Sequence, residues 1–126
     1  MIVGVGLDIV ERARIAERVD DQRFVSRVLT GEEQAIYQQL SAKRKIEYLS
    51  GRFSAKEAYA KARGTGIGAE LSFQDICILD DEVGKPVIFV RQSMDRKQAH
   101  VSITHTRTAA AAVVIIEAAP DESAYS

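Results

Sequence analysis

The stretch from Lys43 to Arg63 constrains the fold more than any other part of the chain. It contains no proline, a single glycine at Gly51, and many alanine and lysine residues, so it predicts a long helix. The glycine-rich segment 64–68 follows at once and is typical of a helix end. In a chain of 126 residues, which suits a single domain, this should be the longest helix.

The segment before this helix predicts a strand followed by short helices. Residues 2–10 alternate, with apolar side chains on one face and Gly4, Gly6 and Asp8 on the other. Glycines within a strand often mark the close approach of a ligand or of another backbone. Residues 11–41 are typical of short helices, and Thr30 followed by Glu33 predicts a capping box at the start of one of them.

The segment after the long helix predicts strands. Ile76–Leu79 and Val87–Val90 flank a polar turn, as in a hairpin. Val101–His105 alternates, and Ala109–Glu117 is almost wholly apolar, which favours a strand covered on both faces. The fold class is therefore α+β, with an antiparallel-rich sheet packed against a long helix and shorter helices. We expect one domain over residues 1–118 and a flexible tail over 119–126.

Composition and charge exclude several classes of protein. The formal net charge of −1 gives no overall attraction to nucleic acid. The longest apolar run, Ala109–Ile116, is too short to cross a bilayer, and no signal-peptide pattern opens the chain. The single cysteine, Cys77, cannot form an intrachain disulfide. We therefore expect a cytoplasmic protein that binds neither membrane nor nucleic acid.

Glu57 interrupts the apolar stripe of the long helix. On a helical wheel it lies about 20° from Ile46, on the face expected to pack on the sheet. One hypothesis is a half-buried ion pair with Lys61, one turn later, or with an arginine. The other is that Glu57 and Asp8 bind Mg²⁺, which takes a few carboxylates together with waters and phosphate oxygens. Asp8 has the alternative of capping the helix that starts near Glu11, but the glycine notch beside it favours the metal.

The same helix carries a basic cluster in which the only acidic residues are Glu47 and Glu57. Such a cluster is either a solvated helix face or a site for polyphosphate, which arginine and lysine bind well. Arg52 lies about 120° from Ile46, well away from Glu57, so the two residues suit a ligand with phosphates at two ends or one shared between subunits. The cluster comprises Lys43, Arg44, Lys45, Arg52, Lys56, Lys61 and Arg63.

Two further features carry weaker signals. Gly64-Thr65-Gly66 lies at a helix C-terminus, where the dipole disfavours anions, so an anion there would depend on loop N–H groups and nearby cations. His105 shares a strand face with Val101 and Ile103, which favours a packed core histidine, with a phosphate contact or a general base as the alternative. No Ser–His–Asp or Cys–His pattern is present in the sequence.

Four blocks of sequence together resemble the holo-acyl-carrier-protein synthases, the small single-domain 4′-phosphopantetheinyl transferases. They cover nearly all of residues 2–117 in the order and spacing of that family, and Gly84-Lys85-Pro86 between the hairpin strands also matches. The block around Glu57 is the most specific. The four are Gly4–Glu11, Arg27–Thr30 with Glu33, Gly51–Ala58 continued through Lys61 to Gly66, and Val101–Thr106.

The resemblance implies a fold, an assembly and a reaction. The fold is α+β and forms a homotrimer with active sites between subunits. The reaction transfers the 4′-phosphopantetheine moiety of coenzyme A to a serine of apo-acyl carrier protein, a step of fatty acid biosynthesis that releases adenosine 3′,5′-bisphosphate. Asp8 and Glu57 would bind Mg²⁺, with Mn²⁺ as the alternative, and Lys61 would complete the catalytic set.

The resemblance also implies binding residues. The coenzyme A pyrophosphate would contact Lys61, Gly64, Thr65 and Gly66. The 3′-phosphate would contact Lys43, Arg44 and Arg52, with His105 and Thr106 contributed by a neighbouring subunit and Pro86 also in the cofactor site. The carrier protein would dock on Arg14, Arg18, Arg23, Phe24 and Arg27, whose alternative role is helix solubility. The serine proton would pass to a metal-bound water, to Glu57 or to His105, in that order of preference.

Some positions depart from the family pattern, and two other functions stay open. Arg63, Ala109, Asp20 and Asp21 are unusual, and segment 91–98 looks too short for the helix that many members carry. These differences concern carrier preference and the cleft wall rather than the metal ligands. A non-catalytic nucleotide-binding or adaptor domain would use the same cations. A nucleic-acid binder would need an aromatic stacking platform, which the basic residues lack.

Overall fold

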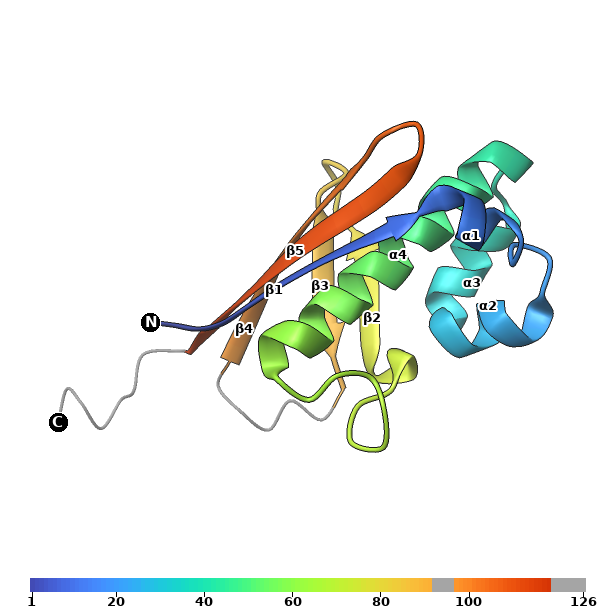
Figure 1. The fold of residues 1–126 in the computed structure, drawn as a ribbon. Helices are drawn as coiled ribbons and strands as arrows, with labels where there is room; N and C mark the ends of the chain where they lie inside the picture. The colour runs from blue at the N-terminus through green and yellow to red at the C-terminus, as the bar shows by residue number, and fades with distance from the viewer. Residues whose placement is uncertain (92–96, 119–126) are drawn as a thin grey trace, which may run out of the picture.

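The computed structural model describes residues 1–91 and 97–118 and confirms the α+β class (Figure 1). The expectations for a tail over 119–126 and for most of segment 91–98 lie outside the described residues. The helical elements are α1 (Arg12–Ala16), α2 (Gln22–Val28), α3 (Gly31–Gln38), α4 (Ala42–Arg63) and the 3₁₀ turn η1 (Phe73–Asp75). The strands are β1 (Ile2–Glu11), β2 (Ile76–Asp80), β3 (Pro86–Val90), β4 (Lys97–His105) and β5 (Ala109–Ala118).

The strands form two antiparallel sheets rather than one. The larger has the order β1-β5-β4, and the smaller is the β2-β3 hairpin expected from the sequence. Helix α4 lies across one face of the larger sheet, and α1, α2 and α3 gather near its N-terminal half (Figure 1). Within this chain β5 buries only the face towards α4, so the expectation of a strand covered on both faces holds for one face.

The local signals in the sequence produce the helices as expected. Thr30 and Glu33 form the predicted capping box at the start of α3. Ser41 caps α4 through the N–H of Arg44, and Gly64 ends α4 in the left-handed conformation, with φ of 87°. These boundaries depend on contacts within a few residues, which is why the sequence reveals them.

The glycines of β1 let α4 lie directly on the strand. A Cβ atom on Gly6 would come within 1.8 Å of the Ala58 carbonyl oxygen, and one on Gly4 within 2.2 Å of the Ala62 carbonyl oxygen. The close approach is therefore to another backbone, the second of the two possibilities that the sequence left open, and the notch itself does not favour a metal at Asp8. Asp8 lies further along the same face, towards the N-terminal half of α4.

The opposite face of β1 is apolar and exposed. Its side chains point away from α4, and the outward side chains of the neighbouring β5 are half-buried. An exposed apolar strip of this kind is unusual on a soluble chain that stays monomeric. The exposed fractions are 49% for Val3, 61% for Val5, 66% for Leu7 and 71% for Ile9.

We predict that Gly6→Ala destabilises the protein strongly. The new methyl group would overlap the backbone of α4, which cannot move without separating the helix from the sheet. We expect a loss of about 3 kcal/mol or more in the free energy of unfolding, at the upper end for overpacking. Chemical denaturation would measure it. Gly31→Ala is the control, because a Cβ there meets nothing within 4 Å, and equal losses in both variants would contradict the prediction.

Candidate functional site

Asp8, Glu57 and Lys61 form a charged group where β1 meets α4. The Lys61 ammonium donates to Asp8 Oδ1 at 3.0 Å and to the Leu7 carbonyl at 3.1 Å. The Asp8 side chain is largely buried, whereas that of Lys61 is 55% exposed. Burial raises the pKa of the Glu57 carboxyl, the charge of Asp8 raises it further, and Lys61 and Arg27 partly offset this. Glu57 and Asp8 are therefore close enough to repel each other.

The structural alternatives for Asp8 and Glu57, a helix cap and an ion pair, can be compared with their contacts. Glu11, not Asp8, is the N-cap of α1, and no side chain caps that helix. Lys61 forms its ion pair with Asp8, and within residues 1–91 and 97–118 no ion pair of Glu57 is recorded. The hydroxyl of Ser54 donates to the Asp8 carbonyl at 3.0 Å and fixes the strand against the helix at this point. Asp8 therefore pairs with Lys61 instead of capping α1, and Glu57 lacks the ion pair with Lys61 that the sequence allowed.

The two carboxylates suit a hard divalent cation that keeps most of its own waters. Among the described residues no group of three or more metal-ligating side chains gathers in one place. A closed protein cage is therefore excluded for that part of the chain. Two carboxylates that repel each other, one with a raised pKa, fit Mg²⁺, which takes few protein ligands and completes its octahedron with water or phosphate.

The glycine loop after α4 uses its amides to end the helix. Gly64 and Gly66 both have positive φ, and both N–H groups donate to the Ala60 carbonyl. These two amides are therefore committed, and an anion beside the loop would depend on other donors. The candidates for binding such an anion are Lys61, in the last turn of α4, and Thr65 in the loop, both of which are exposed.

A second candidate region lies on the other flank of α4. It is a cavity of about 260 Å³, smaller than a typical pocket for a whole ligand. Arg52 is only 7% exposed, donates to the Ile78 carbonyl and Asp80 Oδ1 at 3.3 Å each, and stacks on the Tyr48 ring. The lining includes Arg44, Glu47, Tyr48, Arg52, Asp80, Gly84, Pro86 and His105.

His105 is not a core histidine, so that default expectation is wrong. Its side chain is 46% exposed, and Nε2 lies 2.6 Å from Glu47 Oε1. Thr106 lies outside the lining and serves the β4–β5 turn, where its hydroxyl accepts from the N–H groups of Thr108 and Ala109. His105 thus belongs with Arg44 and Arg52 of the same chain.

The two regions are well separated within one chain. Asp8 lies on β1 opposite Ala112 of β5, which in turn lies opposite Ile103 of β4. Two strand spacings, about 10 Å, therefore separate the strand of Asp8 from the strand of His105. The backbone of α4 crosses the sheet between the two regions. The sequence had already placed Arg52 away from Glu57, and the structure confirms that separation.

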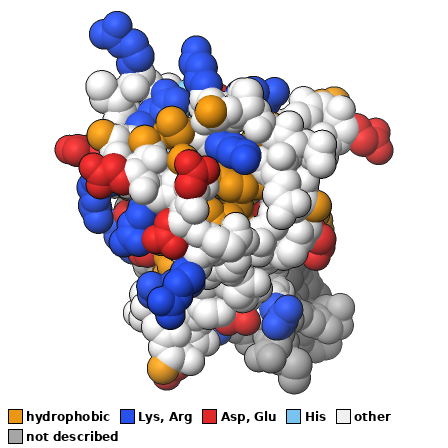
Figure 2. All heavy atoms as spheres, turned by 90° about the vertical axis from the view of Figure 1, so that its right-hand side faces the viewer, with side chains coloured by type: hydrophobic (Ala, Val, Ile, Leu, Met, Phe, Trp, Pro, Cys, Tyr) orange, Lys and Arg blue, Asp and Glu red, His pale blue; other side chains and the backbone are white. Residues whose placement is uncertain are grey.

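The carrier-docking candidates divide between two surfaces. Arg18, Arg23, Phe24 and Arg27 line one hollow on and beside α2, together with Asp21. The Arg18 guanidinium lies 5.0 Å from the centre of the Phe24 ring. Arg14 lines a separate groove. Lys43, which was expected beside the 3′-phosphate, lines the same groove as Arg14 and does not line the cavity that contains Arg44 and Arg52. This end of the molecule shows basic and acidic side chains around a central apolar area (Figure 2).

Sequence reasoning did not identify the acidic partners of Lys56, Arg52 and His105. Lys56, one of the basic cluster, is fully buried against Glu33 and is not available to a phosphate. Glu47 and Asp80 hold His105 and Arg52 within the second cavity. Glu47 offered a signal as one of only two acidic residues in the basic helix. Asp80 and Glu33 offered none, because they lie far away in the sequence.

Comparisons with known proteins agree with one another. The model of the 4′-phosphopantetheinyl transferase superfamily matches residues 4–115. The holo-[acyl-carrier-protein] synthase of Anoxybacillus flavithermus is 58% identical over 118 residues, which cover 93% of this chain and 97% of that protein. That of Bacillus subtilis is 55% identical over the same shares of the two chains.

Solved structures show the same similarity. The Bacillus anthracis holo-(acyl-carrier-protein) synthase in complex with CoA (3′,5′-ADP) superimposes with a TM-score of 0.87 at 43% identity, covering 94% of this chain and 99% of that one. The Helicobacter pylori synthase in complex with coenzyme A gives 0.79 at 32% identity, covering 90% and 99%. None of the helices that the structure describes is long and apolar enough to span a membrane.

We predict that Glu57→Gln stabilises the metal-free protein at neutral pH. The pKa of Glu57 is raised in the folded chain, so the folded chain binds more protons than the unfolded chain between the two pKa values. The free energy of unfolding therefore falls as pH rises through this range, and glutamine avoids that loss. Thermal denaturation in a chelator should give the variant the higher Tm at about pH 7.5, with the difference vanishing below about pH 4.

The exposed carboxylate Glu82 provides the control for this prediction. Glu82 lies in the β2–β3 turn, and Glu82→Gln should leave the pH dependence of Tm unchanged. A Glu57→Gln variant that melts below the parent at neutral pH would show that the charged carboxylate stabilises the fold.

Proposed function

Because the chain belongs to the 4′-phosphopantetheinyl transferase superfamily, we propose that the two flanks of α4 hold the two phosphate-bearing parts of coenzyme A. The chain transfers the 4′-phosphopantetheine moiety of coenzyme A to apo-acyl carrier protein, which gives the holo form. The observation that carries this conclusion is 58% identity to a holo-[acyl-carrier-protein] synthase across 93% of the chain.

Asp8, Glu57 and Lys61 are the proposed catalytic residues. Asp8 and Glu57 would hold Mg²⁺, which when bound withdraws charge from the pyrophosphate. The serine oxygen of the carrier attacks the phosphorus that bears pantetheine, and the bond to the adenosine-side phosphate breaks. Lys61 extends from Asp8 into solvent and neutralises the phosphate that leaves. Positioning and neutralisation of charge supply most of the rate enhancement, as in phosphoryl transfer generally.

Glu57 is the proposed acceptor of the serine proton among the side chains of this flank. Of the two carboxylates on this flank, Asp8 is already paired with Lys61, so Glu57 is the one left to accept a proton. If Asp8 and Glu57 hold Mg²⁺, the ion would also lower the pKa of a water beside it, which is the alternative acceptor. His105 lies on the opposite flank of the same chain, so within one subunit it is too far away to compete.

The second cavity is the proposed site of the 3′-phosphate. Arg44, Arg52 and His105 converge there, and Pro86 and Ile103 add apolar surface. The cavity is too small for the whole cofactor, so it suits one end of a long ligand. Lys61, Gly64, Thr65 and Gly66 would lie beside the pyrophosphate at the other end.

A homotrimer with shared active sites would bring the two ends together. Within one chain the two phosphate regions face opposite flanks of α4, so one subunit would supply Asp8, Glu57 and Lys61 and its neighbour Arg44, Arg52 and His105. This division differs from the one implied by family resemblance, because His105 lies with Arg52 in the same chain. Contacts between unlike surfaces close into rings, as a trimer requires.

The exposed strip of β1 supports this assembly. Val3, Val5, Leu7 and Ile9 form one continuous apolar row on the sheet face opposite α4. Burying such a row against another subunit would be favourable. We also propose that the protein is cytoplasmic and that transfer depends on Mg²⁺.

The carrier protein would dock on the hollow formed by Arg18, Arg23, Phe24 and Arg27. Three arginines around one aromatic ring suit an acidic helix that also offers an apolar side chain. Arg27 is the residue of this hollow that acts on the proposed active site, because its positive charge lowers the pKa of Glu57. The groove that contains Arg14 and Lys43 would extend this surface.

The reaction itself is the first test. Incubation of the chain with apo-carrier protein, coenzyme A and Mg²⁺ should add one phosphopantetheine to the carrier, detected by mass spectrometry. We expect Asp8→Ala and Glu57→Ala to lower the rate by about 100-fold or more while the protein stays folded, as for loss of a charge-stabilising group. A chelator should stop the parent enzyme and added Mg²⁺ should restore it.

The control for these variants is Glu70→Gln, an exposed carboxylate in the loop after α4. It should retain full activity. No mass gain with the parent enzyme would overturn the function, and full activity of Asp8→Ala or Glu57→Ala would overturn the metal assignment alone.

We predict that Val5→Glu breaks the trimer. One charge per subunit placed in an apolar interface opposes association, because burying an unpaired carboxylate is costly. Light scattering after size-exclusion chromatography should show a shift from trimer to monomer, and transfer activity should fall with it. Val83→Glu, at a more exposed position in the β2–β3 turn, is the control. A parent enzyme that is monomeric and fully active would contradict the shared site.

A further inference from the structure

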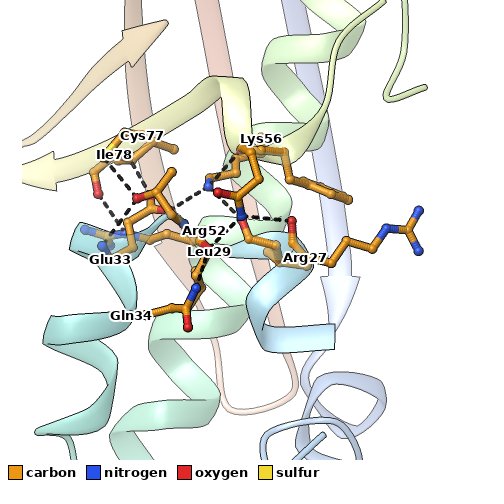
Figure 3. A network of polar contacts seen from close by, with 12 residues as sticks. Arg27, Leu29, Glu33, Gln34, Arg52, Lys56, Cys77 and Ile78 are labelled. Atoms are coloured by element: carbon orange, nitrogen blue, oxygen red, sulfur yellow. Dashed lines mark hydrogen bonds and ion pairs between the residues drawn. The ribbon is translucent and has the colours of Figure 1, made fainter. Parts of the chain in front are cut away.

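A buried ion pair lies one residue away from the proposed metal ligand Glu57. Lys56 and Glu33 are both 0% exposed, and their charged atoms are 2.6 Å apart. The Lys56 ammonium also donates to the Val28 carbonyl at 2.7 Å and to the Phe73 carbonyl at 3.2 Å, so all three of its protons have acceptors (Figure 3). The lysine is fully engaged by the protein.

Glu33 extends the contact to two more segments. Its Oε1 accepts from the Thr30 N–H at 2.8 Å, and its Oε2 accepts from the Ile78 N–H at 2.8 Å. The pair therefore joins the end of α2, the start of α3, α4, η1 and β2 at one point. Replacing a buried pair by apolar residues is often neutral or stabilising, so stability alone is a weak explanation for its presence.

The segment between α2 and α3 is held from a second side as well. The Gln74 side chain in η1 donates to the carbonyls of Ser26 at 2.8 Å, Arg27 at 3.3 Å and Leu29 at 2.8 Å. Lys56 holds the carbonyl of Val28, which lies between the last two. The backbone on both sides of Arg27 is therefore fixed by one buried side chain from α4 and one from η1.

We propose that Lys56 is a positioning residue that, through the Val28 carbonyl, holds Arg27 and the docking surface of α2 in register with Glu57 on α4. Consecutive residues make the link, because Lys56 contacts the carbonyl of Val28, which follows Arg27 at the end of α2, while Lys56 itself precedes Glu57 on α4. The carrier would then present its serine in a geometry set by α4 itself. This inference rests on the docking role proposed above for α2.

Steady-state kinetics with each substrate would test the proposal. We expect Lys56→Met and Glu33→Gln to lower kcat/KM for the carrier by about tenfold, while KM for coenzyme A changes by less than about twofold. Gln74→Ala, at a half-exposed position, should give a smaller effect in the same direction. Ile116→Val, buried in the sheet, is the control, since it lowers stability without touching the pair.

A double-mutant cycle with Arg27→Ala decides between positioning and general support. If Lys56 acts through Arg27, Lys56→Met should lower kcat/KM for the carrier far less in the Arg27→Ala background than in the parent. Fully multiplicative effects, equal changes for both substrates, or a lower Tm with unchanged kinetics would overturn the proposal. If Lys56→Met does not fold, Gln74→Ala carries the same cycle. An inactive parent enzyme would instead overturn the proposed function.

Discussion

The contact between α4 and the glycine face of β1 sets the position of everything else in the site. Gly4 and Gly6 bring the strand against the helix backbone, closer than any other residue type allows. The next inward position with a polar side chain on that face is Asp8, and its carbonyl is fixed by Ser54 of α4. Because the strand and the helix are held together in this way, the Lys61 ammonium lies within hydrogen-bond distance of Asp8 Oδ1. The chemistry depends on a packing contact that carries no charge.

Helix α4 separates the two proposed sites and also carries side chains of both. Its exposed and half-buried charges lie at the two proposed sites, with Glu57 and Lys61 on one flank and Arg44 on the other. Its buried charges serve the fold, because Lys56 reaches α2, α3 and η1, whereas Arg52 reaches β2 and still lines the second cavity. One helix thus carries cations of two kinds, and their burial distinguishes them.

The sequence predicts the local parts of this structure and fails on the long-range parts. The capping box at Thr30, the end of α4 at Gly64 and the β2-β3 hairpin depend on neighbours in the chain, and all were predicted. Lys56 and Lys61 look alike on the helix, and only the distant acceptors Glu33 and Asp8 separate a buried lysine from an exposed one. The residues alone gave a shared metal site of Asp8 and Glu57 as one of two hypotheses. Family resemblance then implied that Asp8, Glu57 and Lys61 form one catalytic group.

Two expectations from the sequence are only partly met by a single chain. The apolar run of β5 favours cover on both faces, yet this chain covers only the face towards α4. Arg52 and Glu57 point to a ligand with two phosphate sites, yet α4 separates those sites within one chain. The homotrimer proposed above would cover this apolar strip and would let a neighbouring chain supply the second phosphate region. The uncovered face and the divided site therefore favour the same assembly for independent physical reasons.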